Sequence, residues 1–242
     1  MNNNFLFAFS GTHGSGKSTF LKDIQKLLVS KNIKFCHIAE IARLCPYPVG
    51  DKSTATAQKW ILYHQFLTEL IANELGILTI MDRCVIDHYA YYQYWLTKGE
   101  LDLSNTASNY NSVFLFPPNK NFLIGDGLRP INIEFQEKID ISIRGIHNKY
   151  SSNYNLYTID PLKISAIKLV IDILSACKPK AMTTNIDYDL VFNKINTVLP
   201  FYKNYKEIIS ISAIDKVLRV ENDKKVFKSD AIINTLTAYI SS

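Results

Sequence analysis

The sequence NFLFAFSGTHGSGKST, residues 4–19, contains the strongest structural signal in this chain. Its apolar part, residues 5–9, predicts a short buried strand, and the apolar residues of 20–29 recur at helical spacing. Between them, residues 11–18 fit the pattern G-x-x-x-x-G-K-S. A glycine loop between a buried strand and a helix is the context in which this pattern binds phosphate.

This loop predicts a site for a nucleoside triphosphate. Its glycines let backbone N–H groups surround a phosphate chain, and the positive end of the following helix points at the same place. We expect Lys17 to reach the β- and γ-phosphates and the Ser18 hydroxyl to bind Mg²⁺. The residues expected to bind ATP are Gly11, His13, Gly14, Ser15, Gly16, Lys17, Ser18 and Thr19.

The composition is that of an ordinary globular protein, with 47% apolar and 20% charged residues in a chain of 242. We expect neither a signal peptide nor a membrane anchor, and the four scattered cysteines indicate reduced thiols in the cytoplasm. The net charge of +5 suits an enzyme that handles phosphates and is mild for a dedicated nucleic-acid binder.

Further apolar runs predict strands that alternate with helices. The strands are expected at residues 33–39, 77–81, 112–116 and 155–159, and the helices at 54–75, 86–97, 101–110, 132–150 and 161–176, with a loop at 45–53. Such alternation indicates a parallel sheet covered on both faces. The carboxyl ends of its strands share one edge, where ligands bind.

The chain is expected to divide at residues 178–180, KPK, into a domain over 1–177 and a small α+β module over 178–242. The module holds ten Lys and Arg against seven Asp and Glu. Its pattern predicts a helix at 187–199, a strand at 208–211, a hairpin at 217–227 and a final helix beginning at Ser229. Its role stays unassigned.

Charged residues follow the predicted strands at that edge. Asp82 ends an apolar run, as a Walker B carboxylate does when it holds Mg²⁺, and Arg83 is expected to face an anionic substrate group. Glu40 follows the second strand, where it either accepts a proton from an attacking hydroxyl or is a helix N-terminal acid. Arg43, nearby, is assigned to substrate binding.

Two further regions carry candidate residues. Residues 125–129, GDGLR, predict a hinged lid in which Arg129 brings positive charge over the transferring phosphate and Asp126 contacts the substrate. The helix with the sequence DHYAYYQYWL, or the helix before it, is expected to offer one or two aromatic rings to a nucleobase. Tyr91 and Trp60 are the two rings we assign to this role.

The motif GTHGSGKST, together with Asp82-Arg83 and the segment AYYQ at 90–93, resembles the thymidylate-kinase-like P-loop kinases. Residues 134–139, EFQEKI, resemble the helix after the lid in that group, whereas Glu40, Arg43 and the segment DGLR resemble the nicotinamide riboside kinase domain of the bacterial NAD regulator. The resemblance implies an α/β fold with a five-stranded parallel sheet in the order 2-3-1-4-5. It also implies ATP and Mg²⁺ as donor, with Asp82 and Arg83 organising the acceptor.

Three functions remain open at this point. The first is a kinase that transfers the γ-phosphate of ATP to a nucleoside or nucleoside monophosphate. The second is a kinase acting on nucleic acid, at a 5′-hydroxyl end or on a modified base, with the basic C-terminal module as a clamp. The third is a regulatory ATPase without a small-molecule acceptor. We expect a homodimer with no membrane partner.

Overall fold

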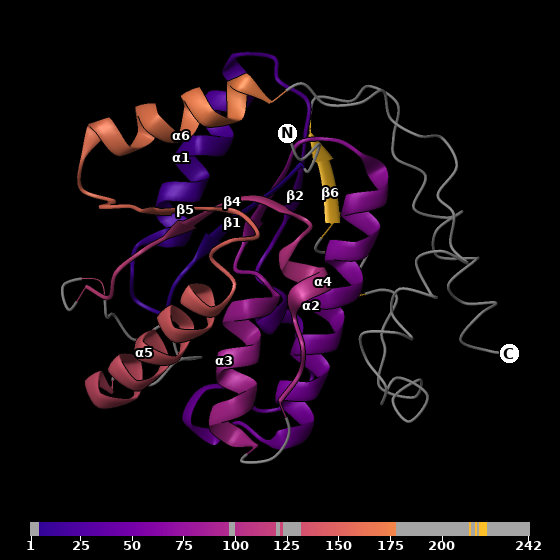
Figure 1. Ribbon diagram of the computed structural model, residues 1–242, viewed down its shortest axis with the longest axis vertical. Helices are drawn as coiled ribbons and strands as arrows, with labels where there is room; N and C mark the ends of the chain where they lie inside the picture. Colours follow the sequence, from indigo (N-terminus) through magenta and orange to yellow (C-terminus); the bar gives the residue numbers. More distant parts are fainter. Residues whose placement is uncertain are drawn as a thin grey trace, which may run out of the picture.

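The computed structural model describes residues 5–96, 100–119, 122, 132–177, 213, 216 and 218–221 (Figure 1). Of the predicted site residues, Asp126 and Arg129 lie outside this part, and so does most of the predicted C-terminal module. None of the described helices combines the length and the apolar character that crossing a bilayer requires.

The centre of the fold is a sheet of five parallel strands. These are β1 (Leu6–Ser10), β2 (Phe35–Ile38), β3 (Thr79–Asp82), β4 (Tyr110–Leu115) and β5 (Asn155–Thr158). Their spatial order is β2-β3-β1-β4-β5, and every neighbouring pair among them is parallel. The predicted strand order and fold class are therefore confirmed.

A sixth strand, β6 (Leu218–Glu221), extends this sheet at its β2 edge and runs antiparallel to β2. Residue 218 pairs with Ile38 and residue 221 with Phe35. The sequence places these four residues in the first half of a hairpin in the C-terminal module. In the structure they cover the edge of the main sheet, which removes a row of unpaired backbone groups.

Helices connect the strands and cover both faces of the sheet. They are α1 (Lys17–Ser30), α2 (Ala55–Leu75), α3 (Val85–Trp95), α4 (Ser104–Ala107), α5 (Ile133–Lys149) and α6 (Ile164–Ala176), with the 3₁₀ helices η1 (Ile41–Leu44) and η2 (Gly50–Lys52). Thr54 caps α2 by accepting a hydrogen bond from the N–H of Ala57 at 3.2 Å, and Gly76 ends it in the left-handed region, with φ 63°. Both ends of this helix agree with the sequence.

The two layers of helices bury alternate residues of β1. Figure 1 shows α1 and α6 on one face of the sheet and α2 and α3 on the other. Phe7 and Phe9 pack in the cluster that includes α1 and α6, whereas Leu6 and Ala8 pack in the cluster that includes α2 and α3. All four side chains are fully buried, as expected for a central strand covered on both faces. The glycine loop leaves β1 between these layers, so its position depends on both cores.

The region between α3 and β4 differs from the prediction. The sequence predicts a helix over residues 101–110, but only the four residues of α4 are helical, and Tyr110 already belongs to β4. The fully buried Tyr110 donates its hydroxyl to Glu69 Oε2 on α2 at 2.7 Å. This contact joins residues 41 positions apart, so no local pattern could reveal it.

Candidate functional site

The carboxyl ends of β1, β2 and β3 place the predicted residues side by side. The glycine loop follows β1, Glu40 lies two residues beyond β2, and Asp82 is the last residue of β3. Because these strands are parallel neighbours, the loop and both carboxylates meet at one edge of the sheet.

The glycine loop is held close to the backbone around it. Gly11 has φ 134°, and a Cβ atom there would lie 2.5 Å from the carbonyl oxygen of Phe116, so only glycine fits. Gly16, at the N-cap of α1, has φ 83°. The Lys17 ammonium lies across the loop and donates to the Thr12 carbonyl at 2.7 Å and to Ser15 Oγ at 3.0 Å.

Ser18 and Asp82 form the predicted pair beside this loop. Ser18 Oγ donates to Asp82 Oδ2 at 2.7 Å, and Asp82 Oδ1 is buried with no hydrogen-bond partner in the described part of the chain. Burial, and next the charge of Glu40, raise the pKa of Asp82, while Lys17 opposes this. A hydroxyl and an unpartnered buried carboxylate oxygen are the donors that Mg²⁺ prefers, so the residues fit the ion that the motif implies.

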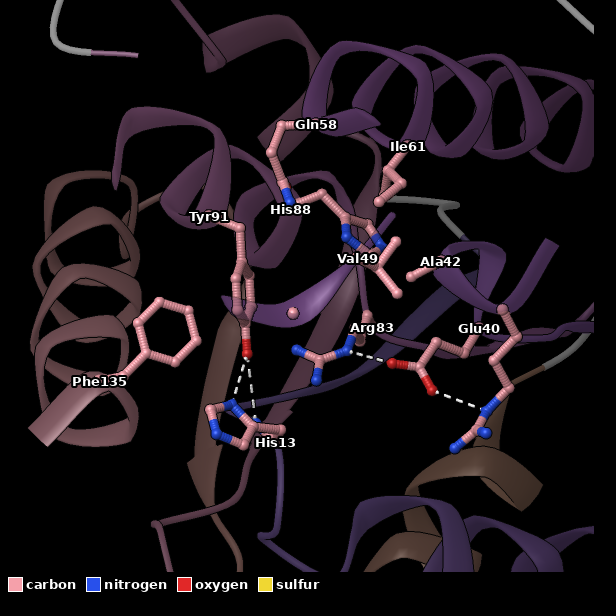
Figure 2. Close-up of a pocket in the computed structure, with 12 residues that line it drawn as sticks. His13, Glu40, Ala42, Val49, Gln58, Ile61, Arg83, His88, Tyr91 and Phe135 are labelled. Atoms are coloured by element: carbon pink, nitrogen blue, oxygen red, sulfur yellow. Dashed lines mark hydrogen bonds and ion pairs between the residues drawn. The ribbon is translucent and has the colours of Figure 1, made fainter. Parts of the chain in front are cut away.

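Glu40 is fixed between two arginines (Figure 2). Its Oε1 accepts from Arg83 Nε at 2.9 Å, and its Oε2 accepts from Arg43 Nε at 3.1 Å. The side chains of Glu40 and Arg83 are each 4% exposed, whereas that of Arg43 is 47% exposed. The inner pair is therefore a buried ion pair whose geometry solvent does not loosen.

Arg83 links this carboxylate to the glycine loop. Its Nη1 donates to the Gly11 carbonyl at 3.0 Å, and its guanidinium carbon lies 5.2 Å from the centre of the Tyr91 ring. Its backbone is left-handed, with φ 77°, which is uncommon for a residue other than glycine. Such conformations persist where surrounding contacts over-determine them, and functional sites are where they gather.

A pocket opens next to Glu40 and Arg83 (Figure 2). Its walls combine the aromatic rings of Tyr91 and Phe135 with apolar side chains such as Ile61. Elements far apart in the sequence meet there: η1, η2, α2, α3 and α5 each contribute at least one residue. Apolar walls with a few convergent polar groups are typical of small-molecule sites.

The lining residues that the sequence analysis did not anticipate include two polar ones, Gln58 and His88, and the aromatic Phe135. His88 is 2% exposed, and its Nε2 has no hydrogen-bond partner among the described residues. Burial, together with the charge of Arg83, lowers the pKa of His88 to about 3, so its imidazole is neutral. Gln58 donates from Nε2 to Ser53 Oγ at 2.6 Å. Neither residue belongs to a motif, and only their position on helices that face one pocket reveals them.

The two aromatic residues assigned to the substrate occupy different places. Tyr91 lines the pocket, and its hydroxyl also lies 3.0 Å from His13 Nδ1. Tyr91 therefore also contacts the glycine loop. Trp60 is not among the described lining residues. Its buried ring stacks on His64 with 3.8 Å between ring centres, in a cluster with Ile41 and Ile61. On α2 it is the positions of Gln58 and Ile61 that face the pocket.

His13 lies where the loop meets the pocket. It lines the pocket, its ring centre is 5.5 Å from that of Phe135, and its carbonyl accepts from Gln136 Nε2 at 2.6 Å. Helix α5 therefore contacts the loop directly. Thr19, also expected to bind ATP, is exposed on the first turn of α1.

The family model described as an AAA domain, AAA_28, matches residues 6–160. No curated protein matches the sequence. A solved structure that matches is described as deoxyadenosine kinase from M. mycoides with products dCMP and a flexible dCDP bound; it is 16% identical, with a TM-score of 0.49 over 71% of this chain and 99% of that chain. The family match spans more than half of the chain, which therefore belongs to the AAA domain family and has its P-loop nucleotide-binding fold.

Proposed function

We propose that this chain is a kinase that transfers the γ-phosphate of ATP to a nucleoside or nucleoside monophosphate. The observation that carries the proposal is the position of Glu40. It is a buried carboxylate on the wall of a small-molecule pocket, and Arg83 connects it to the carbonyl of Gly11 in the phosphate loop. Phosphate transfer requires the acceptor group and the phosphate donor to lie next to each other, and these contacts place Glu40 next to the phosphate loop.

Each residue has one task in the transfer. The backbone of the loop and Lys17 bind the triphosphate, and the acceptor hydroxyl in the pocket faces Glu40. The hydroxyl oxygen forms a bond to the γ-phosphorus while the bond from the γ-phosphorus to the bridging oxygen of ADP breaks. The proton of the hydroxyl passes to Glu40. Mg²⁺ at Ser18 and Asp82 would neutralise charge on the phosphates.

The pocket favours a nucleoside over a nucleotide as the acceptor. A phosphate on the acceptor would need cations of its own, and the two arginines among the described lining residues, Arg43 and Arg83, already pair with Glu40. The aromatic rings of Tyr91 and Phe135 suit a planar base, and the neutral His88 and the amide of Gln58 suit hydrogen bonding to its edge. The assignment of Arg43 to substrate binding stays a prediction.

A transfer assay tests the function. Purified protein with γ-labelled ATP and Mg²⁺ is incubated with nucleosides, nucleoside monophosphates and oligonucleotides that carry a 5′-hydroxyl. We expect a labelled nucleoside, and no product with Lys17→Ala. Labelled oligonucleotide, with activity that falls steeply as salt rises, would support the nucleic-acid kinase instead. Release of inorganic phosphate without any labelled acceptor would support the regulatory ATPase.

A further inference from the structure

A chain of hydrogen bonds runs behind the phosphate loop, from Tyr154 to Asp87. The Tyr154 hydroxyl lies 2.6 Å from His147 Nδ1, and His147 Nε2 lies 2.7 Å from Ser10 Oγ. Ser10 Oγ donates to Asp87 Oδ1 at 3.0 Å, and the same oxygen accepts the N–H of Gly11 at 2.7 Å. The chain thus ends on the first glycine of the loop.

The direction of each bond follows from its acceptor. Burial raises the pKa of Asp87, but Arg83, His147, the Gly11 N–H and Lys17 together lower it below its ordinary value, so the carboxylate is ionised and only accepts. The Ser10 hydroxyl therefore donates its hydrogen bond to Asp87 and accepts one from His147 Nε2–H. Burial lowers the pKa of His147 to about 4, so the ring is neutral and its Nδ1 accepts from Tyr154. Every donor in this chain has an acceptor.

The other oxygen of Asp87 holds the start of α3. Asp87 Oδ2 accepts the backbone N–H of Cys84 at 2.9 Å and its thiol at 3.1 Å. Cys84, Asp87 and His147 bring three potential metal-ligand atoms within 4.8 Å of one another. Each of these atoms already takes part in a hydrogen bond within the protein, which a metal ion would have to break. The arrangement is a hydrogen-bonded network, and we do not assign it a metal.

We propose that Asp87 is a positioning residue for nucleotide binding, which fixes the direction of the first peptide of the phosphate loop. Glycine at position 11 can adopt many backbone conformations, so its peptide needs an external partner to select one. Asp87 supplies that partner as an ionised acceptor on the Gly11 N–H, and Ser10 and His147 hold Asp87 in place. The proposal rests on nucleotide binding by the loop and not on the identity of the acceptor.

Binding of a non-hydrolysable ATP analogue with Mg²⁺, measured by calorimetric titration of the whole chain, tests the role. We expect Asp87→Ala to weaken the affinity by about 10- to 100-fold and Ser10→Ala by about threefold to tenfold, as for losses of charge-assisted positioning bonds. Glu69→Ala is the matched control. Glu69 is also buried and bonds to the N–H of Val85 in α3, but no hydrogen bond joins it to the loop in the described residues. It should lower Tm and leave Kd unchanged.

A pair of variants at His147 separates positioning from stability. Glutamine can keep an N–H donor near the place of Nε2, so His147→Gln should bind the analogue nearly as wild type does, whereas His147→Ala should weaken binding like Ser10→Ala. This pair of variants distinguishes a positioning role from a purely structural one even if Asp87→Ala does not fold. The proposal would be overturned if the folded Ala variants bound the analogue with the wild-type Kd. It would also be overturned if affinity fell in proportion to Tm in every variant, Glu69→Ala included. A wild-type chain that binds the analogue but phosphorylates no acceptor would instead refute the proposed function alone.

Discussion

The phosphate loop and the pocket beside Glu40 differ in how much of their structure is local. Within the loop, Lys17 and Ser15 both donate to the Thr12 carbonyl, and distant residues such as Arg83 and Asp87 add bonds to its first glycine. The pocket is assembled from five separate elements, and its central ion pair joins Glu40 to Arg83 across 43 residues. A local structure depends on few partners, whereas a distributed one depends on the packing of the whole domain. Substitutions in the two regions should therefore fail in different ways.

The largest effect is expected at Lys17. Lys17→Ala removes the cation expected on the β- and γ-phosphates, so kcat for phosphate transfer should fall by about 1,000-fold or more, as for losses of a main electrostatic contact in a transition state. The change should leave Tm within a few degrees of wild type, because the hydrogen bonds from Lys17 to Thr12 and Ser15 stay within the loop, whose bonds to Arg83 and Asp87 are kept. Lys26→Ala on the same helix, where Lys26 pairs with Asp23 on an exposed surface, is the control. Equal loss in both variants would contradict the assignment.

On the acceptor side, Glu40→Gln keeps the shape of the side chain and removes its basicity. We expect kcat to fall by about 100- to 1,000-fold while KM for ATP stays close to wild type, since general base catalysis contributes this much. The variant also loses charge opposite Arg83, so Tm should fall, unlike that of Lys17→Ala. Full activity in Glu40→Gln would show that the acid is only structural. Glu134→Gln, in the first turn of α5, serves as the control.

A smaller effect is expected where the pocket contacts the acceptor itself. His88→Ala and Gln58→Ala should each raise KM for the acceptor by about tenfold and change KM for ATP little, because each removes one hydrogen-bonding group from the wall. Trp60→Phe is the comparison, since its ring packs on His64 outside the pocket. If Trp60→Phe raised the KM of the acceptor more than His88→Ala does, the ring rather than the imidazole would recognise the substrate.

The smallest effect on activity is expected at Glu69, a buried residue of α2 that is not among the lining residues of the pocket. Burial, partly offset by hydrogen bonds from Tyr110 and Gln65, raises its pKa from 4.5 to about 7. The folded state then holds a proton that the unfolded state has lost. The contribution of Glu69 to stability is therefore complete below about pH 4.5 and falls as the pH rises through 7, by about 3 kcal/mol at most.

Glu69→Gln should remove this dependence, because an amide resembles the protonated acid. Denaturant unfolding at pH 5.5 and at pH 8 measures it: the difference in the free energy of unfolding between the two pH values should be smaller in the variant. His88 and His147, with lowered pKa values, give the opposite slope below about pH 6.5 in both proteins, so it cancels in the comparison. An identical pH profile for both proteins would contradict the raised pKa.

The same contrast explains what the sequence could predict. The loop, the strands and the extent of α2 follow from local signals: glycine spacing, apolar runs and a terminal glycine, whereas the strand order was implied by the family resemblance. The pocket does not, because a position on a helix is assigned to a pocket only once the neighbouring helices are placed. Gln58 and Trp60 lie two residues apart on α2, yet only Gln58 lines the pocket. Asp82 and Glu40 were identifiable because parallel strands bring their carboxyl ends together.

Arg83 has a thermodynamic consequence for the order in which substrates bind. One guanidinium bonds both to Gly11, where the triphosphate is expected, and to Glu40, where the acceptor hydroxyl is expected. A ligand that makes Arg83 rigid at either contact reduces the conformational entropy that the protein must lose when the second ligand binds. The two substrates should therefore bind with positive cooperativity. Such coupling is reciprocal: the factor by which ATP tightens the acceptor equals the factor by which the acceptor tightens ATP. A single side chain would thus make the affinity of the pocket for the proposed acceptor depend on whether the donor is already bound.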